Sequence, residues 1–583
     1  MLKSNNITTN FSKTIVYGTK MNRIEISKKH LVLIFLFLLI FIVGTILIFI
    51  TPTSIKIIYG RTVKTSDGET ISFNVLEPKR GGSNKKAVII GHGIMSNKEM
   101  MKGYAIELAA AGFVAIPFDF RGHGQSSGEL DRDRLINDVQ AILSYVNSRA
   151  DINSSALGYL GFSMGGFPGI EIVNQSTNFK CFVGAGTRLP TNVRLGNYSE
   201  PLNILMILGR YDEIITIEEL KEGLSDRVGL PSADIDVNKL YGSFQDGNAS
   251  MIYLDDTTNH VLGIWDPDFI REARNFIMNT FPNVKAVDEN FFVNIRFLIL
   301  VLQIIGGIGF FFLITSPLSK FILNSKQNDR VTIELENESV NTTIIKTISY
   351  SIVLGIPGVI IFIPILMILP LAIAGFVSAL LFGQMFGILI LLCRLGKKEN
   401  LTLLNIIKKP FNTSKEKLVK QIFLGAILAV IYYVILYLSI GLNYLGMVPA
   451  LMKMLWVPIY FMIFFFIFII LGLLFHSVLQ NKVGSGLRNF IKVSLMIFGF
   501  FFLYMFSYLF ILAIIMNSFF YFGSFLPIAI PIFLLTAFSS TLIYQKSGNV
   551  IAGAIVNSLF LTLVICTLSP YQNGLSFILG FFH

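Results

Sequence analysis

The chain has 583 residues, of which 53% are hydrophobic and only 14% are charged. Soluble domains carry about 25% charged residues, so this composition excludes a protein that is soluble along its whole length. Three cysteines exclude a disulfide framework, because only Cys181 lies outside the apolar segments. The net charge of +11 reflects either a nucleic-acid partner or a membrane topology, depending on where the basic residues lie.

The first apolar segment, residues 31–50, follows a basic tail at 1–30 that is predicted to be cytoplasmic. Its twenty uncharged residues are enough to cross about 30 Å of hydrocarbon as a helix. A cleaved signal peptide is the alternative. The apolar run exceeds the usual ~7–15 residues of such peptides, however, and no small-x-small cleavage site follows it. We therefore predict a retained transmembrane signal anchor.

Residues 54–282 have the mixed charge and glycine-containing turns of a globular domain, and strand-like and helix-like segments alternate along them. This alternation predicts an α/β fold with a mostly parallel sheet and helices on both faces. An amphipathic helix is predicted at 131–148. The clearest predicted strands are 85–93, 112–120, 156–162, 180–186, 202–209 and 251–256.

The strand predicted at 156–162 runs directly into the sequence GFSMGG at 161–166, which contains Ser163. A G-x-S-x-G match alone is weak. Here a strand precedes it and a helix-compatible stretch follows, which predicts the strand–turn–helix of a nucleophile elbow. In such a turn, side chains at Gly161 or Gly165 would collide with neighbouring backbone. The helix N-terminus would also favour negative charge that develops near Ser163.

A serine nucleophile needs a base, and the base needs an orienting acid. His260 follows the strand predicted at 251–256 and is the only histidine of the domain after Ser163. Asp212 follows the strand predicted at 202–209. The chain order Ser163, Asp212, His260 is the order used with this kind of elbow, so we predict these three as the catalytic residues.

Two further aspartates, Asp255 and Asp256, are rival candidates for the acid. Both lie on the same strand end that leads to His260, whereas Asp212 follows a different strand at the position where the acid is expected. We therefore favour Asp212 and expect Asp255 and Asp256 to be surface residues.

An oxyanion hole needs backbone N–H groups from the residue after the nucleophile and from a loop after an upstream strand. Met164 is predicted to supply the first, and Ile94, in the sequence GHGI at 91–94, the second. His92 and His123 are interpreted as turn residues that hydrogen-bond their own loops, because no acidic or cysteine partner stands at metal-ligand spacing. No metal and no cofactor are therefore expected.

Five motifs of this domain occur together in one known family: Gly91-His92-Gly93, DFRGHGQSSG at 119–128, GFSMGG at 161–166, GRYDE at 209–213 and Asn259-His260. Through them, residues 54–282 resemble the α/β-hydrolase superfamily, most of all its monoacylglycerol-lipase-like and serine-aminopeptidase-like members. The resemblance implies acyl transfer through an acyl-serine intermediate, with ester, thioester or amide substrates. Many relatives insert a helical lid after the strand that matches 180–186. This chain has only a short connection there and a longer insertion at 217–250, so lid-based substrate selection is not implied.

From about residue 291 the chain is apolar again, and we predict a membrane domain over 291–583 with about eight further transmembrane helices. After residue 339 the only acids are Glu399 and Glu416, both in a predicted cytoplasmic loop. Pumps and coupled transporters carry ionisable residues within their spans, so these functions are disfavoured. The predicted spans lie near 295–315, 347–368, 371–393, 421–442, 455–478, 493–516, 524–544 and 549–568.

The basic residues are concentrated in alternate loops. If the N-terminus is cytoplasmic and nine spans alternate, the inner segments hold 22 Lys and Arg, and the short outer loops after residue 316 hold one, Lys453. This positive-inside bias predicts that the 54–282 domain lies outside the cytoplasm. The inner segments carry a net +15, more than the whole chain, so the basic character reflects membrane topology and no nucleic-acid partner is expected.

The predicted function is therefore that of a membrane-anchored serine hydrolase, carboxylesterase- or lipase-like, which cleaves ester or amide bonds on the extracytoplasmic face. The expected partners are a small-molecule, lipid or peptide acyl substrate and the lipid bilayer, and the oligomeric state stays open. An acyltransferase or a serine peptidase with the same triad is one alternative. A ligand-binding domain of a membrane sensor or transporter is another, but it would predict loss of a triad residue, and none is lost.

Overall fold

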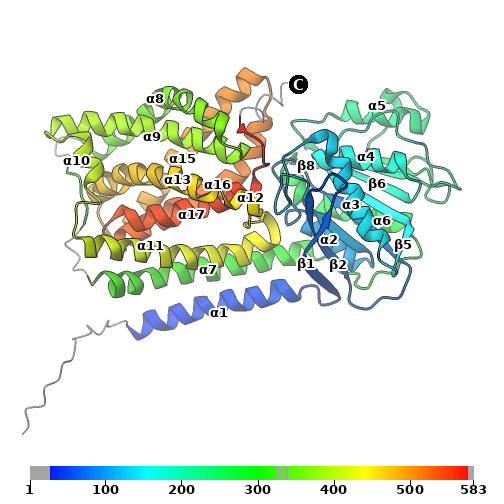
Figure 1. Cartoon of the computed structure of the whole chain (residues 1–583), viewed down its shortest axis with the longest axis horizontal. Coiled ribbons are helices and arrows are strands. Elements are labelled where there is room, and N and C mark those ends of the chain that lie inside the picture. Colours follow the sequence, from blue (N-terminus) through cyan, green and yellow to red (C-terminus); the bar gives the residue numbers. More distant parts are fainter. Residues whose placement is uncertain (1–26, 325–329, 335–338, 575–583) are drawn as a thin grey trace, which may run out of the picture.

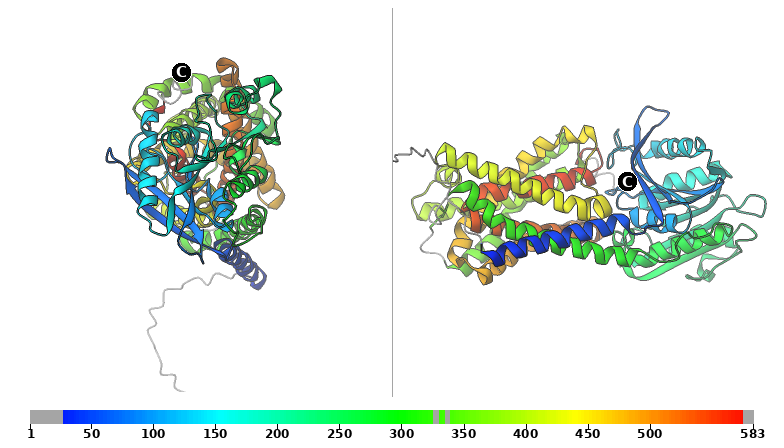
Figure 2. Two further views of the ribbon diagram at one scale, coloured as in Figure 1. Left: turned by 90° about the vertical axis from the view of Figure 1, so that its right-hand side faces the viewer. Right: turned by 90° about the horizontal axis from the view of Figure 1, so that it is seen from below.

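The computed structural model of the chain describes residues 27–324, 330–334 and 339–574. It has two parts, a sheet domain and a bundle of long helices, which lie end to end along the longest axis (Figure 1). The bundle helices run roughly along this axis, so each presents one end to the sheet domain (Figure 2). The predicted cytoplasmic tail at 1–30 lies, as far as residue 26, outside the described residues.

One sheet forms the centre of the domain, and its eight strands are β1 (Ile55–Lys64), β2 (Thr70–Pro78), β3 (Lys85–Gly91), β4 (Val114–Phe118), β5 (Ile152–Phe162), β6 (Phe179–Ala185), β7 (Asn203–Tyr211) and β8 (Ser250–Asn259). Their order is β1-β2-β4-β3-β5-β6-β7-β8. The β1–β2 and β2–β4 pairs are antiparallel, and all the others are parallel. The predicted α/β fold with a mostly parallel sheet is confirmed, and β1 and β2 add an antiparallel edge that was not predicted.

Helices cover both faces of the sheet. In β3, Val88 and Ile90 pack on the first face, whereas Ala87 and Ile89 pack on the second. A strand that is buried on both faces has a continuous apolar sequence, as the AVII segment of β3 does. The first face is covered by α2 (Lys102–Ala110) and α6 (Pro267–Thr280), and the second by α3 (Leu135–Asn147), α4 (Gly166–Gln175) and α5 (Ile217–Val228).

The described residues contain nine helices that are long and apolar enough to cross a membrane, as expected of a multi-pass membrane protein. They are α1 (Lys28–Ile50), α7 (Val293–Leu323), α8 (Val340–Ile368), α9 (Ala372–Lys398), α11 (Lys415–Leu436), α13 (Val457–Gly472), α15 (Leu487–Met516), α16 (Phe520–Ser547) and α17 (Val550–Leu568). Both α11 and α13 continue into π-helical turns, at Tyr437–Leu445 and Leu473–Gln480. Two short helices, α10 (Leu403–Lys408) and α12 (Leu451–Met454), lie between the spans, and α14 (Asn481–Val483) ends the span that begins with α13.

The helix α1 packs lengthwise against α7 (Figure 1). Glycines of α7 permit the close approach: a Cβ at Gly306 would lie 2.5 Å from the backbone nitrogen of Phe41, and one at Gly309 would collide with the ring of Phe37. Small residues serve the same purpose wherever membrane helices pack closely. The N-terminal helix is thus an integral part of the bundle.

Glu107, on α2, links the sheet domain to the bundle. Its Oε1 accepts hydrogen bonds from the backbone N–H groups of Phe292 (2.6 Å) and Val293 (3.0 Å) at the start of α7. The side chain is fully buried, and Arg274 lies 3.7 Å from Oε2. Burial raises the pKa of Glu107 to about 7, against the opposing effect of these hydrogen bonds and of Arg274. The carboxylate of Glu107, a residue of the sheet domain, therefore caps the N-terminus of α7, a helix of the bundle.

Replacing Glu107 with glutamine is expected to remove a pH dependence of the stability. The pKa is 4.5 in its ordinary environment and about 7 in the folded protein, so the folded state binds the proton more tightly. The wild type therefore loses stability as the pH rises between these values, by up to about 3 kcal/mol, and loses no more above the higher value.

Thermal unfolding of the full chain in detergent measures this effect. The Glu107→Gln variant should gain stability relative to the wild type between about pH 5 and about pH 8. Glu218→Gln, at an exposed position of α5, is the control. An equal gain in both variants would contradict the assignment to Glu107.

The loops at the carboxyl ends of the parallel strands face the bundle. Among the described residues, three backbone hydrogen bonds join the two parts: Ala450 donates to Gly124 (2.9 Å), Leu130 donates to Tyr571 (3.1 Å), and Tyr571 donates to Gly122 (2.7 Å). Ligands of open α/β sheets bind beyond the carboxyl ends of the strands. The region where the predicted catalytic residues lie is therefore directed towards the membrane helices.

Candidate active site

Ser163 lies on a sharp turn between β5 and α4. Its φ of +49° is a left-handed conformation that is rare for a residue with a side chain. The neighbouring glycines make the turn possible, because a Cβ at Gly161 would lie 2.5 Å from the carbonyl oxygen of Gly165, and one at Gly165 would lie 2.7 Å from the backbone of Gly91. Local strain of this kind is typical of a nucleophile elbow, where it exposes the serine hydroxyl.

The structure brings Ser163, His260 and Asp212 together in one hydrogen-bonded chain. The Oγ of Ser163 lies 2.9 Å from Nε2 of His260, and Nδ1 of His260 lies 2.8 Å from Oδ2 of Asp212. The other carboxylate oxygen of Asp212 accepts hydrogen bonds from the N–H groups of Ile214 (2.9 Å) and Ile215 (3.0 Å). With Nδ1 donating to Asp212, Nε2 is free to accept the serine proton.

The two rival aspartates are occupied elsewhere. Asp256 is exposed and pairs with Arg210 at 2.6 Å. The Oδ1 of Asp255 accepts hydrogen bonds from the N–H groups of Thr257 (2.8 Å) and Thr258 (3.0 Å). The expectation that Asp255 is a surface residue was wrong: β8 continues past it, and the side chain is buried within the strand.

The two residues predicted for the oxyanion hole lie in backbone segments on either side of Ser163. Met164 follows Ser163 in the 3₁₀ turn (Ser163–Gly165) that precedes α4. Ile94 follows Gly93, where a Cβ would come within 3.1 Å of the Cβ of Ser163. Both segments therefore border Ser163, and the two residues stay predictions for an oxyanion hole.

His92 and His123 connect loops, in keeping with their interpretation as turn residues. The Nε2 of His92 accepts a hydrogen bond from the N–H of Phe120 at 3.0 Å, so its Nδ1 carries the proton and donates to the carbonyl of Gly93 at 2.7 Å. Burial lowers the pKa of His92 to about 4, which keeps the ring neutral at physiological pH. Nδ1 of His123 lies 3.0 Å from the carbonyl oxygen of Arg121.

A buried ion pair supports the loop that carries Ile94. Both the N–H (2.7 Å) and the ammonium (2.6 Å) of Lys98 donate to the carboxylate of Asp119, which also accepts from the N–H of Gln125 at 2.9 Å. Burial disfavours the charge of Asp119, but the ammonium of Lys98 together with smaller effects, such as the hydrogen bond from Gln125, holds the pKa of Asp119 below its usual value. Sequence reasoning did not identify this pair, because no local pattern relates Lys98 to Asp119.

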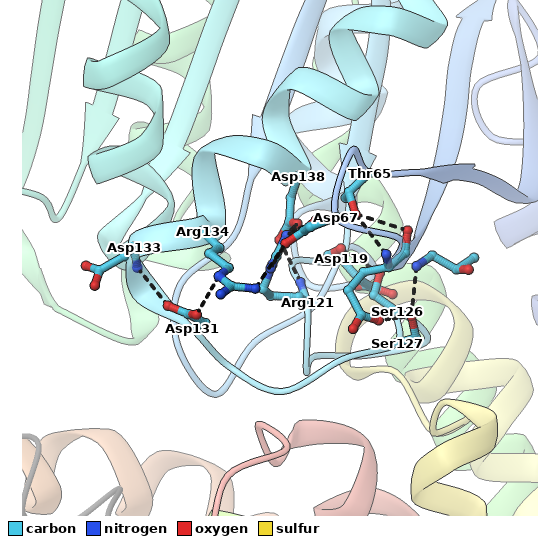
Figure 3. Close-up of polar contacts among 12 residues, drawn as sticks. Thr65, Asp67, Asp119, Arg121, Ser126, Ser127, Asp131, Asp133, Arg134 and Asp138 are labelled. Carbon is cyan, nitrogen blue, oxygen red and sulfur yellow. Dashed lines mark hydrogen bonds and ion pairs between the residues drawn. The ribbon is translucent and has the colours of Figure 1, made fainter.

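Arg121, in the DFRGHGQSSG motif, has a structural role. Its guanidinium lies between the carboxylates of Asp138 and Asp67, as Figure 3 shows, with hydrogen bonds of 2.9 Å from Nε and 2.7 Å from Nη1. Burial raises the pKa of Asp138 to about 6, and Arg121 opposes that rise. The motif therefore ties the turn after β4 to α3 and to the β1–β2 connection.

Glu213 links the histidine loop to the bundle, and sequence reasoning missed it. Its carboxylate accepts hydrogen bonds from the backbone N–H of His260 (3.3 Å) and from the amide of Asn259 (3.1 Å). A side chain at Gly523 of α16 would collide with this carboxylate, so the glycine leaves room for Glu213. The ring of Phe520, also on α16, lies edge-on to the ring of His260 with centroids 6.4 Å apart. A membrane helix thus forms part of the wall beside His260.

Three carboxylates elsewhere in the described residues, Asp255, Asp266 and Asp268, lie within 4.8 Å of one another. They already have local hydrogen-bonding roles, since Asp266 accepts from the N–H groups of Asp268 (2.8 Å) and Phe269 (3.1 Å) at the start of α6. Such groups are common without an ion, and the hydrogen-bonded chain at Ser163 does not involve them.

Comparison with known proteins gives a family match for part of the chain. Residues 82–213 match the sequence model of the Hydrolase_4 family, described as serine aminopeptidase, S33. An uncharacterized 31.7 kDa protein from Escherichia coli is 29% identical over 126 residues, and the uncharacterized protein YfhR from Escherichia coli K12 is 27% identical over 150. The matches cover 21% and 22% of this chain, and only 42% and 53% of the relatives.

Two solved structures of esterases are also similar to part of the chain. The esterase Pf2001 from Pyrococcus furiosus is 20% identical, with a TM-score of 0.31 over 39% of this chain and 94% of its own. The esterase EaEST from Exiguobacterium antarcticum is 13% identical, with a TM-score of 0.28 over 37% of this chain and 99% of its own.

Proposed function

The sheet domain is an α/β-hydrolase domain, and from this premise we propose that the protein is a membrane-embedded serine hydrolase. Its reaction is the cleavage of carboxylic esters, in the manner of a carboxylesterase or lipase, through an acyl-serine intermediate. The observation that carries the proposal is the continuous hydrogen-bonded chain from Ser163 through His260 to Asp212. These are the contacts that serine-based acyl transfer needs in its resting state.

In the first half of the reaction, His260 removes the proton of Ser163 through Nε2 while Oγ forms a bond to the acyl carbon. Asp212 holds the imidazole by its Nδ1–H and stabilises the positive charge that forms. The N–H groups of Ile94 and Met164 donate to the oxyanion. The bond to the leaving alkoxide then breaks, and His260 returns the proton to that oxygen.

In the second half, water attacks the acyl carbon of the acyl-serine. His260 takes one proton of the water, the bond to Oγ of Ser163 breaks, and the proton passes to Oγ. The products are a carboxylic acid and the restored serine. Amide cleavage by a peptidase, or transfer to an alcohol by an acyltransferase, would use the same residues with a different leaving group or acceptor.

The domain is proposed to act on the extracytoplasmic face. The loops that join the bundle helices at the end farthest from the sheet domain carry the basic residues, for example those around α10 (Figure 1). The positive-inside bias supports a cytoplasmic location for that end, and thus an extracytoplasmic location for the sheet domain.

Labelling of intact cells with a membrane-impermeant fluorophosphonate tests the reactive serine and its side of the membrane together. The wild type is expected to be labelled without permeabilisation, because the probe bonds covalently to a serine activated by His260. The Ser163→Ala variant should stay unlabelled at an equal amount in the membrane.

The possible results distinguish an error in the proposed side of the membrane from an error in the proposed nucleophile. Labelling that requires permeabilisation would refute the extracytoplasmic placement but leave the hydrolase. Equal labelling of the wild type and the Ser163→Ala variant would refute Ser163 as the nucleophile.

A further inference from the structure

The wall of the catalytic site is shared between the sheet domain and the bundle. Ile94, which borders Ser163, and Ile214, which follows the acid loop, are partly buried and pack both on the core of the sheet domain and on the core of the bundle. Met95, directly after Ile94, has a φ of +61° and belongs to the buried core of the bundle. The loop that borders the nucleophile therefore extends into the membrane part of the protein.

Met95 also lines an apolar cavity. Thirteen residues line it, and among these described residues Ser524 alone is polar and none is charged. Apart from Met95 they belong to α9, α15, α16 and α17. Its volume is about 50 Å³.

The cavity lies at the end of the bundle that faces the sheet domain. It uses Val377 near the start of α9, Ala529 in the first half of α16 and Leu568 at the end of α17. Met95 is only two residues beyond Gly93, whose backbone borders Ser163. Two residues span at most about 7 Å of backbone, so the cavity begins within a short distance of the nucleophile.

We propose that this cavity binds the hydrocarbon chain of a lipid-like acyl substrate whose carbonyl carbon reacts with Ser163. This inference rests on the function proposed above and adds the substrate class, an ester of a fatty acid that enters from the bilayer. The bundle then forms the acyl-chain site in place of the helical lid that many relatives insert after the strand matching β6.

The residues that line the cavity favour a hydrocarbon chain as its ligand. The Ser524 hydroxyl is the one polar side-chain group that this uncharged cavity offers to an occupant, whereas each methylene buried there contributes about a fourfold gain in binding. A water-sized group needs roughly 10–15 Å³ of such space, so the cavity takes about four methylenes as it stands. Short acyl groups such as acetyl do not reach it, and longer chains do.

The chain-length dependence of ester cleavage tests the proposal, using p-nitrophenyl acetate and p-nitrophenyl decanoate with the full-length protein in detergent. The wild type is expected to have a kcat/KM for the decanoate about 200-fold above that for the acetate, since about four methylenes are buried and each contributes about fourfold. The Val377→Trp variant fills the cavity and should lose most of this preference, while acetate cleavage stays within about twofold.

Val353→Trp is the matched control, because Val353 is 63% exposed on the outside of α8 and the same substitution there leaves the cavity open. It should behave as the wild type with both esters. Ala529→Phe is a second filling variant, and fluorophosphonate labelling of Ser163 shows whether each variant is folded.

The failure of this inference differs from a failure of the proposed function. Wild-type protein that is labelled and cleaves the acetate, but shows equal kcat/KM for both esters, would overturn the acyl-chain site alone. A chain-length preference that survives in both filling variants would also overturn it. Wild-type protein that is neither labelled nor active with the acetate would overturn the hydrolase itself.

Discussion

The Ser163→Ala variant is expected to hydrolyse p-nitrophenyl acetate with a kcat about six orders of magnitude below that of the wild type. The substitution removes the oxygen that forms the acyl-enzyme and leaves the φ of +49° unchanged. Because only one hydroxyl is lost, the thermal unfolding of the variant should match that of the wild type within a few degrees. Activity near the wild-type level would show that another residue is the nucleophile.

The double variant Ser163→Ala with His260→Ala sharpens this test. Residues that act as one unit have strongly non-additive effects, so the double variant should be no slower than Ser163→Ala alone. If the two losses multiplied, Ser163 and His260 would be contributing independently, and the hydrogen bond of 2.9 Å between them would have no catalytic meaning.

The Asp212→Asn variant is expected to lose about four orders of magnitude in kcat. The N–H groups of Ile214 and Ile215 hold Oδ1 of Asp212, and the carboxamide oxygen of asparagine will keep that position. Its NH₂ group then faces Nδ1 of His260 and donates to it. The ring must carry its proton on Nε2, so it can no longer accept the proton of Ser163.

Asp256→Asn is the control for this variant, because Asp256 is an exposed neighbour of the histidine loop and pairs with Arg210. Its kcat should stay within about twofold of the wild type, as is usual for a surface substitution. A large loss in Asp256→Asn together with a small one in Asp212→Asn would reverse the assignment of the acid. The measurement is kcat for p-nitrophenyl acetate at saturating substrate.

Six strands of the sheet and the long apolar helices could be predicted because their signals are local. A run such as AVII in β3 indicates a strand that is buried on both faces, and an apolar stretch as long as 31–50 indicates a transmembrane helix. Neither prediction requires knowledge of a distant residue. The same pattern does not tell where a strand stops: β8 continues to Asn259, and Asp255 is buried although it was expected at the surface. Asp255 and Asp256 are consecutive charged residues, and such a pair indicated the end of the strand rather than its continuation.

The candidate nucleophile was also within reach of local reasoning. A strand, a Gly-x-Ser-x-Gly turn and a helix follow one another directly in the chain, so Ser163 needed no tertiary information. Residues that reach the histidine loop from far along the chain did need such information. Glu213 accepts a hydrogen bond from the histidine loop, and Phe520 contacts His260 from a membrane helix. No periodic pattern of residues in the sequence indicates either contact.

The sequence by itself determined that a hydrolase-like domain is joined to a membrane bundle, because composition, apolar length and an elbow motif are properties of single segments. Only the tertiary structure decided that the catalytic edge of the sheet faces the bundle. In that orientation Met95 packs on apolar residues of α9, α16 and α17. Packing between distant segments depends on the shapes of both surfaces, which hydrophobic periodicity along one segment does not record.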